Sequence, residues 1–506
     1  MKTLTLLSLT GLGLAAAAQT AQRPNIILLV ADDLGYGDLS CYGATRVSTP
    51  CVDSLAQAGL RFTDAHACAS TSTPSRYALL TGQYPFRQSG TDVAAGNAGM
   101  IISPDRYTVA DALHEAGYAT AAIGKWHLGL GSQTAQQDWN GTLDQSPADL
   151  GFDYHYIMAA TADRVPCVFI ENGRIANFDP SAPIAVSYSK NFEGEPTGRN
   201  NPELLTKLHP SHGHDMSIVN GISRIGYMKG GGKALWRDED IADSIASHAI
   251  SFIEQNAERP FFVYLCTNDV HVPRYPHERF RGKSPMGLRG EAIMQFDWTV
   301  RQVTDALKRL GLADNTLLII TSDNGPVLDD GYADQAETLA GSHQPGGPFR
   351  GAKYSSYEAG SVVPFIVHWP AHVNGGKVSD ALISQIDAVA SLAALAGTTL
   401  PDSAAPDSRN ALATWLGDSQ RSRDYAIKMA SNHNLVLRTD RWKYIPPCKG
   451  SAMITWGPKI ETGNADTPQL YEMTDELGER HNVANSHARL VKKFDSWIED
   501  IRAGKR

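Results

Sequence analysis

Acidic and amide side chains follow two apolar segments at the point where each segment ends. Asp32 and Asp33 come directly after the apolar run 25–31, and Asp323 and Asn324 follow a second apolar run. Carboxylate and amide oxygens are the hard ligands that calcium prefers, and no nearby cysteine favours a softer metal. These residue types at the ends of the two runs predict a calcium site formed by the four side chains, although aspartates on the surface without a metal give the same local pattern.

The segment 72–76, which reads STPSR, is typical of the start of a helix. We expect Ser72 or Thr73 to cap this helix, Pro74 to take its first position, and Gly82 to end it. Ser72 then lies beside backbone N–H groups without helical partners, at the positive end of the helix dipole. The segment is a candidate anion-binding site, although a helix with ordinary capping residues shows the same pattern.

Lysine and histidine side chains follow two further apolar runs. Lys125 and His127 come after the run 119–123, and His271 comes after the run 261–266. In open α/β sheets the ligand lies outside the carboxyl ends of the strands, so we expect these residues and the acidic ones to share one edge. A histidine in that position is a candidate general acid or base.

The elements that must position these residues alternate between strands and helices. Helical spacing of apolar residues recurs over 241–253 and 293–307, and capping signals predict helices from Thr49 to Gly59 and from Thr108 to Gly117. The expected strands are 25–31, 119–123, 261–266, 317–321 and 363–369. The pattern predicts an α/β fold, a mostly parallel sheet sandwiched by helices.

The amino-acid composition changes near residue 400, where a linker rich in proline, alanine and serine begins. Beyond it, 435–438 and 442–445 predict a hairpin, 469–473 a strand, and Ser486 the cap of an amphipathic helix. We expect a small α+β domain there. The predicted organisation is a signal peptide at 1–22, a catalytic domain at 23–399, and a C-terminal α+β subdomain at 400–506.

Composition narrows the class of function. The 506 residues carry a net charge of −9, which disfavours nucleic-acid binding, and no segment after the signal reaches the roughly 18 apolar residues of an integral membrane segment. Residues 1–22 combine Lys2, an apolar stretch and a small-residue cleavage site, so we expect an exported protein, periplasmic or secreted. The six cysteines form no metal motif, and a bridge between Cys41 and Cys51 stays open.

Together these motifs resemble the formylglycine-dependent sulfatases, the type I, arylsulfatase-like members of the alkaline-phosphatase superfamily. The matching segments are, in chain order, 32–38 (DDLGYGD), 72–76 with Thr81 and Gly82, 124–129 (GKWHLG) and 322–325 (SDNG). The resemblance covers nearly the whole mature chain. It implies an alkaline-phosphatase-like fold and the hydrolysis of sulfate monoesters on carbohydrates.

The resemblance also implies roles for individual residues. Ser72 is oxidised to formylglycine, which ligates one calcium ion with Asp32, Asp33, Asp323 and Asn324 and attacks sulfur. His271 protonates the departing sugar oxygen, and His127 is the base that later regenerates the aldehyde. The implied catalytic set is Ser72, Arg76, Lys125, His127, His271 and Lys353, in which the Arg and the two Lys bind the charge of the sulfate and of the nucleophile.

Two positions depart from the family pattern. Family members more often have cysteine at the position of Ser72, and a serine implies an anaerobic radical sulfatase-maturating enzyme as partner, in an anaerobic bacterium. After Lys353 the family commonly has a motif that contains an arginine. The corresponding segment here, 358–364 (EAGSVVP), contains no arginine and has Val362 at that position. This second departure puts a local structural pairing in doubt rather than the chemistry.

The substrate expected from the resemblance is a galactose or N-acetylgalactosamine sulfate of host mucin or glycosaminoglycan. Loop segments rich in hydrogen-bonding groups are candidates for recognising the sugar. The candidate substrate-binding residues are Asp163, Arg164, His212, His214, Arg274, His277 and Arg350. His209, His212 and His214 form a cluster that could be a second metal site, but the serine, glycine and proline among them favour a plain loop.

Two other functions are consistent with parts of this sequence. A phosphoesterase of the same superfamily would use unmodified Ser72 and a pair of transition metals, but Asn324 stands where such a site needs another ligand. A non-catalytic protein that binds sulfated glycans would leave Ser72 unconverted. The presence of Lys125, His127 and His271 counts against that second alternative.

Overall fold

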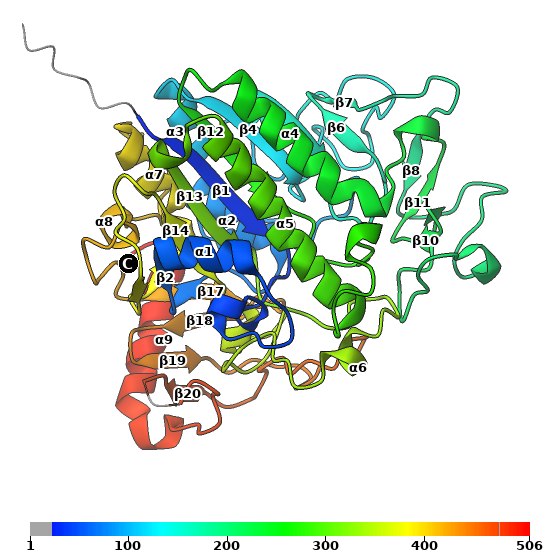
Figure 1. Cartoon of the computed structure of the whole chain (residues 1–506). Coiled ribbons are helices and arrows are strands. Elements are labelled where there is room, and N and C mark those ends of the chain that lie inside the picture. The colour runs from blue at the N-terminus through cyan, green and yellow to red at the C-terminus, as the bar shows by residue number, and fades with distance from the viewer. Residues whose placement is uncertain (1–22, 475) are drawn as a thin grey trace, which may run out of the picture.

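The computed structural model describes residues 23–474 and 476–506, so the predicted signal peptide at 1–22 lies outside the described residues. A ten-stranded sheet forms the centre of the molecule (Figure 1). In spatial order its strands are β15 (Lys377–Ser379), β2 (Leu60–Phe62), β14 (Phe365–His368), β13 (Thr316–Ser322), β1 (Asn25–Ala31), β12 (Phe261–Cys266), β4 (Ala119–Lys125), β5 (Tyr154–Met158), β6 (Phe169–Glu171) and β7 (Arg174–Ile175).

The middle of this sheet is parallel and completely buried. Strands β13, β1, β12, β4 and β5 run in one direction, with Ala31 opposite Ser322 and Cys266 opposite Gly124. Every residue of β1, β4, β12 and β13 is buried, as expected for strands covered on both faces. This register brings the carboxyl ends of four neighbouring strands to one edge, which confirms the expected α/β fold.

Helices cover both faces of the sheet. Helices α1, α4 and α5 pack together on one face, and α2, α3 and α7 on the other (Figure 1). The helices are α1 (Pro50–Ala58), α2 (Ser72–Thr81), α3 (Val109–Glu115), α4 (Ile241–Gln255), α5 (Gly287–Arg309), α6 (Ala336–Ala340), α7 (Ala388–Ala396), α8 (Leu412–Trp415) and α9 (Ala488–Arg502).

Several predicted helix ends need correction. Helix α2 begins two residues earlier than expected from Pro74 at its first position: Thr71 is its N-cap residue, Ser72 its first residue, and Pro74 its third. Gly82 ends it at φ 63°, as predicted. Ser486 belongs to a short 3-10 turn, and α9 begins at Ala488. Thr108 caps α3 through the predicted capping box with Asp111.

The segment expected at 363–369 is a strand, but it runs antiparallel. Strand β14 pairs antiparallel with β13 and with β2, whereas β15 pairs parallel with β2 at the edge, so the sheet is mixed outside its parallel middle. The long segment between β7 and α4 adds two small antiparallel pairs that no periodicity predicted. They are β8 (Ala185–Ser187) with β11 (Tyr227–Lys229), and β9 (Ile218–Val219) with β10 (Ile222–Ser223); a further short parallel pair elsewhere joins β3 (Ala65–His66) to β16 (Ile383–Ser384).

The C-terminal segment forms a four-stranded antiparallel sheet packed against α9; the hairpin, the last strand and the helix were predicted, and β17 was not (Figure 1). Its strands are β17 (Ala426–Met429), β18 (Leu435–Arg438), β19 (Trp442–Ile445) and β20 (Gln469–Glu472). Leu437 and Phe494 of this sheet and helix pack in one apolar cluster with Ala78 of α2 and with Tyr84. The C-terminal sheet therefore shares a core with the helix that carries Ser72.

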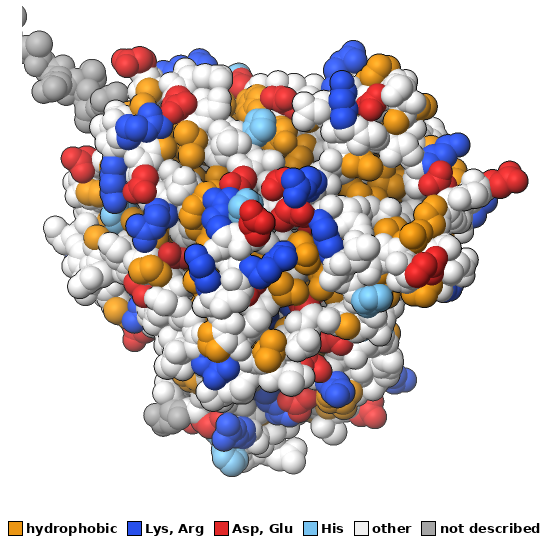
Figure 2. Space-filling model, turned by 45° about the vertical axis from the view of Figure 1, so that its right-hand side comes forward, with side chains coloured by type: hydrophobic (Ala, Val, Ile, Leu, Met, Phe, Trp, Pro, Cys, Tyr) orange, Lys and Arg blue, Asp and Glu red, His pale blue; other side chains and the backbone are white. Residues whose placement is uncertain are grey.

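The described residues contain free cysteines only, so Cys41 and Cys51 form no bridge. Within 23–474 and 476–506, no helix is both long and apolar enough for a transmembrane span. On the face shown in Figure 2, basic and acidic side chains are interspersed rather than gathered by sign.

Candidate active site

The functional residues meet at the carboxyl edge of the parallel strands. Asp32 follows β1, Asp323 follows β13, Lys125 is the last residue of β4, and His271 lies in the loop after β12. Ser72 comes to the same place from the first turn of α2. The structure thus brings together the predicted calcium ligands and the predicted catalytic residues.

Ser72 lies between a lysine and an amide. The ammonium group of Lys125 donates to Ser72 Oγ at 2.8 Å and to Asp32 Oδ1 at 2.6 Å. The hydroxyl of Ser72 donates to Asn324 Oδ1 at 3.2 Å. All of these side chains are buried. A cation and a helix N-terminus therefore both face the Ser72 oxygen, which suits a nucleophile that carries or develops negative charge.

Arg76 belongs to the same helix and pairs with the acid after β13. Its Nε donates to Asp323 Oδ2 at 2.9 Å, and neither side chain is more than 1% exposed. Burial alone would raise the pKa of Asp323, but the positive charges of Arg76 and Lys125 hold it below its usual range. Asp323 is therefore ionised. Because Arg76 contacts the carboxylate of Asp323, it orients this acidic side chain.

Asp33 connects Asn324 to the second catalytic lysine. Asn324 Nδ2 donates to Asp33 Oδ1 at 2.8 Å, and Lys353 Nζ donates to Asp33 Oδ2 at 2.8 Å and to Asp330 Oδ2 at 2.9 Å. Burial alone would lower the pKa of Lys353, but Asp33 and Asp330 raise it well above its usual range. Asp330 was not predicted as a site residue, because its loop carries no motif.

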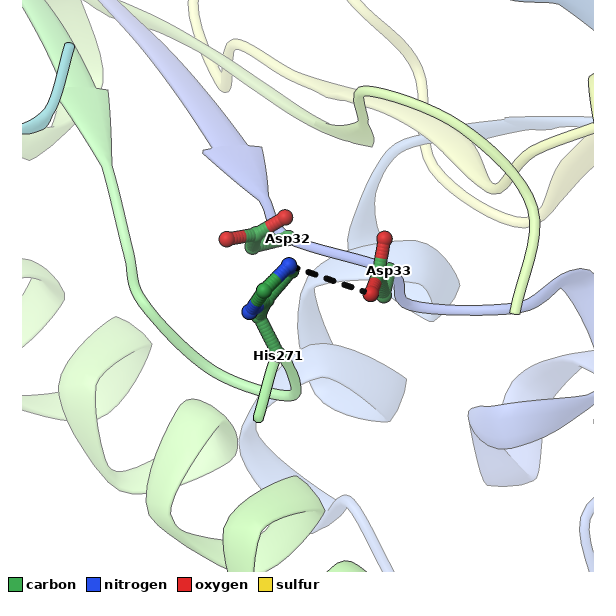
Figure 3. A group of neighbouring side chains, drawn as sticks. All are labelled: Asp32, Asp33 and His271. Carbon is green, nitrogen blue, oxygen red and sulfur yellow. Dashed lines mark ion pairs between the residues drawn. The ribbon is translucent and has the colours of Figure 1, made fainter. Parts of the chain in front are cut away.

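The donor set fits a calcium ion. Asp32 Oδ2 is buried and accepts no hydrogen bond, and Asp32, Asp33 and His271 each place a ligand atom within 4.8 Å of the others. Figure 3 shows both carboxylates at the end of β1, with His271 facing Asp33 from the loop after β12. Burial, together with the carboxylates of Asp323 and Asp33, raises the pKa of Asp32 well above its usual range in spite of Lys125. This repulsion among hard oxygen donors is what a divalent cation would relieve.

The two histidines have different surroundings. The Nε2–H of His127 donates to the carbonyl of Ala94 at 2.9 Å, so its buried Nδ1, which has no partner, carries the free lone pair. The Nδ1–H of His271 donates to its neighbour's carbonyl, the Val272 oxygen, at 2.6 Å, and its Nε2 lies 3.8 Å from Asp33 Oδ2. Burial lowers the pKa of both rings, with further lowering from Lys125 at His127 and from Lys353 at His271.

A cavity of about 380 Å³ opens onto these residues. Four predicted substrate-binding residues line it, and two of them form a buried pair: His214 Nε2 donates to Asp163 Oδ2 at 2.9 Å. Arg164 donates to both oxygens of the Asp163 carboxylate at 3.0 Å. The complete lining is Ser72, Val93, His127, Asp163, Arg164, Arg199, His212, Gly213, His214, Asp215, Met216, Ile225, His271, Asp330, Lys353, Tyr354 and Trp456.

Three predicted substrate-binding residues do not line this cavity. The buried guanidinium of Arg274 is bonded to three backbone carbonyls and to Asp334 Oδ2 at 2.7 Å, so it braces a loop. His277 accepts hydrogen bonds from Arg279. Arg350 pairs with Glu461 at 2.6 Å. The predicted histidine cluster also divides, because His209 is exposed and outside the cavity, as expected for a plain loop.

Cations of the C-terminal sheet lie beside Glu358, in the segment where the arginine of the family motif is missing. Lys443 Nζ lies 2.6 Å from Glu358 Oε1, and Arg438 Nε lies 3.4 Å from Glu358 Oε2. These cations come from β19 and β18, and Glu358 is buried. Although burial alone would raise the pKa of Glu358, Lys443 and its neighbouring cations hold it below the usual range. The cations that pair with Glu358 therefore come from the C-terminal sheet.

The fold and the site define an alkaline-phosphatase-like hydrolase with an anion-binding pocket at the carboxyl edge of its sheet. The sulfatase family model matches residues 24–398. The chain belongs to the sulfatase family and is a sulfuric ester hydrolase. This membership favours the sulfatase prediction over the phosphoesterase and the non-catalytic alternatives.

Individual relatives agree with this assignment. An N-acetylgalactosamine-6-O-sulfatase from Bacteroides thetaiotaomicron is 52% identical over 484 residues, covering 96% of this chain and 94% of that protein. Human arylsulfatase A is 31% identical over 488 residues, covering 93% and 85%. A solved sulfatase structure from the glycosaminoglycan metabolism of B. thetaiotaomicron has a TM-score of 0.93 at 52% identity, and the match covers 96% of this chain and 100% of that one.

Proposed function

We propose that this sulfatase removes the 6-O-sulfate of N-acetylgalactosamine in glycosaminoglycan fragments, with formylglycine formed from Ser72 and one calcium ion. The substrate is supported by the relative that is 52% identical over nearly the whole chain. The chemistry is supported by one observation above all: Ser72 Oγ lies between Lys125 and Asn324 at the start of α2. The galactose alternative of the same substrate class differs only in the substituent at C2.

The ion and the aldehyde supply what the unmodified side chains lack. Asp32, Asp33, Asp323 and Asn324 would hold the calcium ion, which would neutralise their charge and supply Lewis-acid stabilisation for the sulfate ester. Formylglycine, when formed and hydrated at position 72, supplies the hydroxyl that attacks sulfur. The chain must meet a radical maturating enzyme for that conversion, and we propose that it works after export, in the periplasm or outside the cell.

The resident side chains bind and move protons. Lys125 and Lys353 place positive charge beside the nucleophile and the sulfate, where charge develops in the transition state. His271 is the proton donor to the sugar oxygen, and the anionic substrate raises its pKa when it binds. His127 lines the cavity, its Nδ1 has no hydrogen-bond partner, and burial lowers the pKa of its ring, which suits a base that restores the aldehyde.

Release of sulfate from a panel of sugars tests the proposal. The chain is produced with a radical maturating enzyme, and mass spectrometry of the peptide with Ser72 should show the loss of two hydrogens. We expect sulfate release from N-acetylgalactosamine 6-sulfate, with lower activity on the 4-sulfate and on N-acetylglucosamine 6-sulfate, and none from N-acetylgalactosamine 6-phosphate. The Ser72→Ala chain, matured in the same way, is the matched control.

Preference for another sulfated sugar would overturn the proposed substrate and leave the sulfatase assignment intact. Turnover of the phosphate ester with two zinc ions per chain would overturn the proposed cofactors. Activity of the Ser72→Ala chain within tenfold of the unsubstituted chain would overturn the role of Ser72.

A further inference from the structure

The mouth of the cavity carries exposed apolar side chains that the catalytic residues do not explain. Among the described residues, six large hydrophobic side chains are well exposed, and two of them, Trp456 and Val93, line this one cavity. Trp456 is 54% exposed. Large aromatic side chains left open to water at a pocket mouth are a recurrent feature of ligand-binding surfaces.

Trp456 reaches the cavity on a structured loop of the C-terminal segment. Within this loop the N–H of Ile454 donates to the carbonyl of Ile460 at 2.9 Å, which closes the turn that carries the indole. The loop is docked beside the catalytic lysine, because Ser356 N donates to the Thr462 carbonyl at 2.8 Å. The indole therefore has a defined position relative to Lys353.

Aromatic and histidine rings fix the orientation of the indole. The Trp456 and Tyr354 rings meet edge to face, with centroids 5.2 Å apart at 81°, and the His212 ring lies 6.0 Å away. Tyr354 is itself held by its hydroxyl, which donates to Asp330 Oδ1 at 2.8 Å. A Cβ atom at Gly457 would lie 2.2 Å from His212 Nε2, so the loop passes close to the His212 ring at this glycine.

We propose that Trp456 is a specificity-determining residue that packs its indole face against the pyranose ring of the sugar sulfate. This inference rests on the proposed function. A pyranose has a face of C–H bonds that suits the apolar, electron-rich face of an aromatic ring. The polar edge of the same sugar then meets the buried Asp163, Arg164 and His214 group, which lines the cavity with Trp456. Inorganic sulfate lacks the ring and gains nothing from the indole.

Trp456→Ala should raise KM for N-acetylgalactosamine 6-sulfate about tenfold and leave kcat nearly unchanged, since an aromatic contact is lost from bound substrate and transition state alike. Trp456→Phe should recover most of the loss. The inhibition constant of inorganic sulfate should not change. Met453→Ala is the matched control, because Met453 is exposed in the same loop and does not line the cavity. Thermal unfolding of each variant checks that the fold is intact.

Calorimetric titration of the Ser72→Ala chain separates this inference from the proposed substrate. The probes are N-acetylgalactosamine 6-sulfate, galactose 6-sulfate and N-acetylglucosamine 6-sulfate. If only one of the other two binds, and Trp456→Ala weakens it about tenfold, the proposed substrate fails and the inference stands. Equal affinities with and without Trp456→Ala, binding of none of the three, or a parallel loss of inorganic sulfate binding overturns the inference.

Discussion

At the scale of single residues, charge balance decides how the site binds its ligand. The carboxylates of Asp32, Asp33 and Asp323 are paired with three cations: Arg76, Lys125 and Lys353. Asp330 is a fourth carboxylate, which pairs with Lys353. A sulfate ester adds further negative charge to this buried edge. Burial, with smaller contributions from the carboxylates of Asp323 and Asp33, raises the pKa of Asp32 above its usual range in spite of Lys125. A divalent cation held by these carboxylates would offset the repulsion among them, and its binding would then be linked to that of the anionic substrate.

Asp323→Asn should weaken calcium binding and turnover together. The substitution keeps the side-chain volume but removes a charge that a six- to eight-ligand oxygen shell needs. Calcium content per chain, measured by elemental analysis after dialysis, should fall, and chelation of the unsubstituted chain should reproduce the loss of activity. Asp402→Asn, at an exposed position, is the control. Normal calcium binding by Asp323→Asn would make Asp323 a structural partner of Arg76 only.

His271→Ala should lose about 10²–10⁴-fold in rate on a sugar sulfate, the usual contribution of a general acid. The departing sugar alkoxide needs a proton, whereas an aryl sulfate leaves as a stabilised phenolate. The loss on an aryl sulfate should therefore be much smaller, while Lys125→Ala should damage both reactions. Initial rates on the two substrates make the comparison, and equal losses would limit His271 to binding.

The charge state of His271 gives this comparison a pH dependence. Burial and then Lys353 lower the pKa of the ring, so the free site holds the neutral form at pH 7. An acid must be protonated to act, so kcat/KM for the sugar sulfate should fall with rising pH, from a midpoint below the usual 6.5 of histidine.

At the scale of elements, strand ends and one ion-pair group determine where the loops lie. Asp38, in the segment 32–38 after β1, accepts Arg289 of α5 through both carboxylate oxygens at 2.7 Å and His343 at 2.7 Å. Although burial alone would raise it, Arg289 and His343 lower the pKa of Asp38 to about 2. This group fixes the loop after β1 to a helix and to a distant loop.

Asp38→Asn should lower stability and flatten its pH dependence. Because the folded pKa lies below the unfolded value of 3.8, Asp38 stabilises the fold above pH 3.8, and this contribution of about 2 kcal/mol is lost as the pH falls to about 2. The unfolding temperature measured from pH 6 to pH 2 should drop less steeply in the variant. Identical slopes would show that other carboxylates control acid unfolding.

The same elements explain what the sequence could predict. The runs that become β1, β4, β12 and β13 are mostly apolar because both faces of the strands are covered. The polar residues at their ends could therefore be recognised from the sequence. Arg274 was misassigned because a buried arginine bonded to carbonyls has the same local sequence as an exposed one. Trp456 and Asp330 were missed because no periodicity or motif marks loops whose positions depend on tertiary packing.

At the scale of the whole molecule, the C-terminal segment packs against elements that carry the candidate catalytic residues. Its cations balance the buried Glu358 next to the Lys353 loop, and its apolar side chains pack with α2. Lys443 is completely buried and contacts Glu358 at 2.6 Å and Glu479 at 3.0 Å. Removing one partner of such a group leaves charge buried and unpaired, which costs about 3–5 kcal/mol.

We therefore predict that the boundary near residue 400 does not separate two independently stable domains. Calorimetry of the full chain should show one unfolding transition, and Lys443→Met should lower its temperature while impairing turnover. A chain ending at Thr399 should not fold, because it loses the cations around Glu358 and the apolar cover of α2 together. Two separate transitions, or a soluble 23–399 chain that unfolds at the temperature of the full protein, would show that the C-terminal sheet is an appended domain.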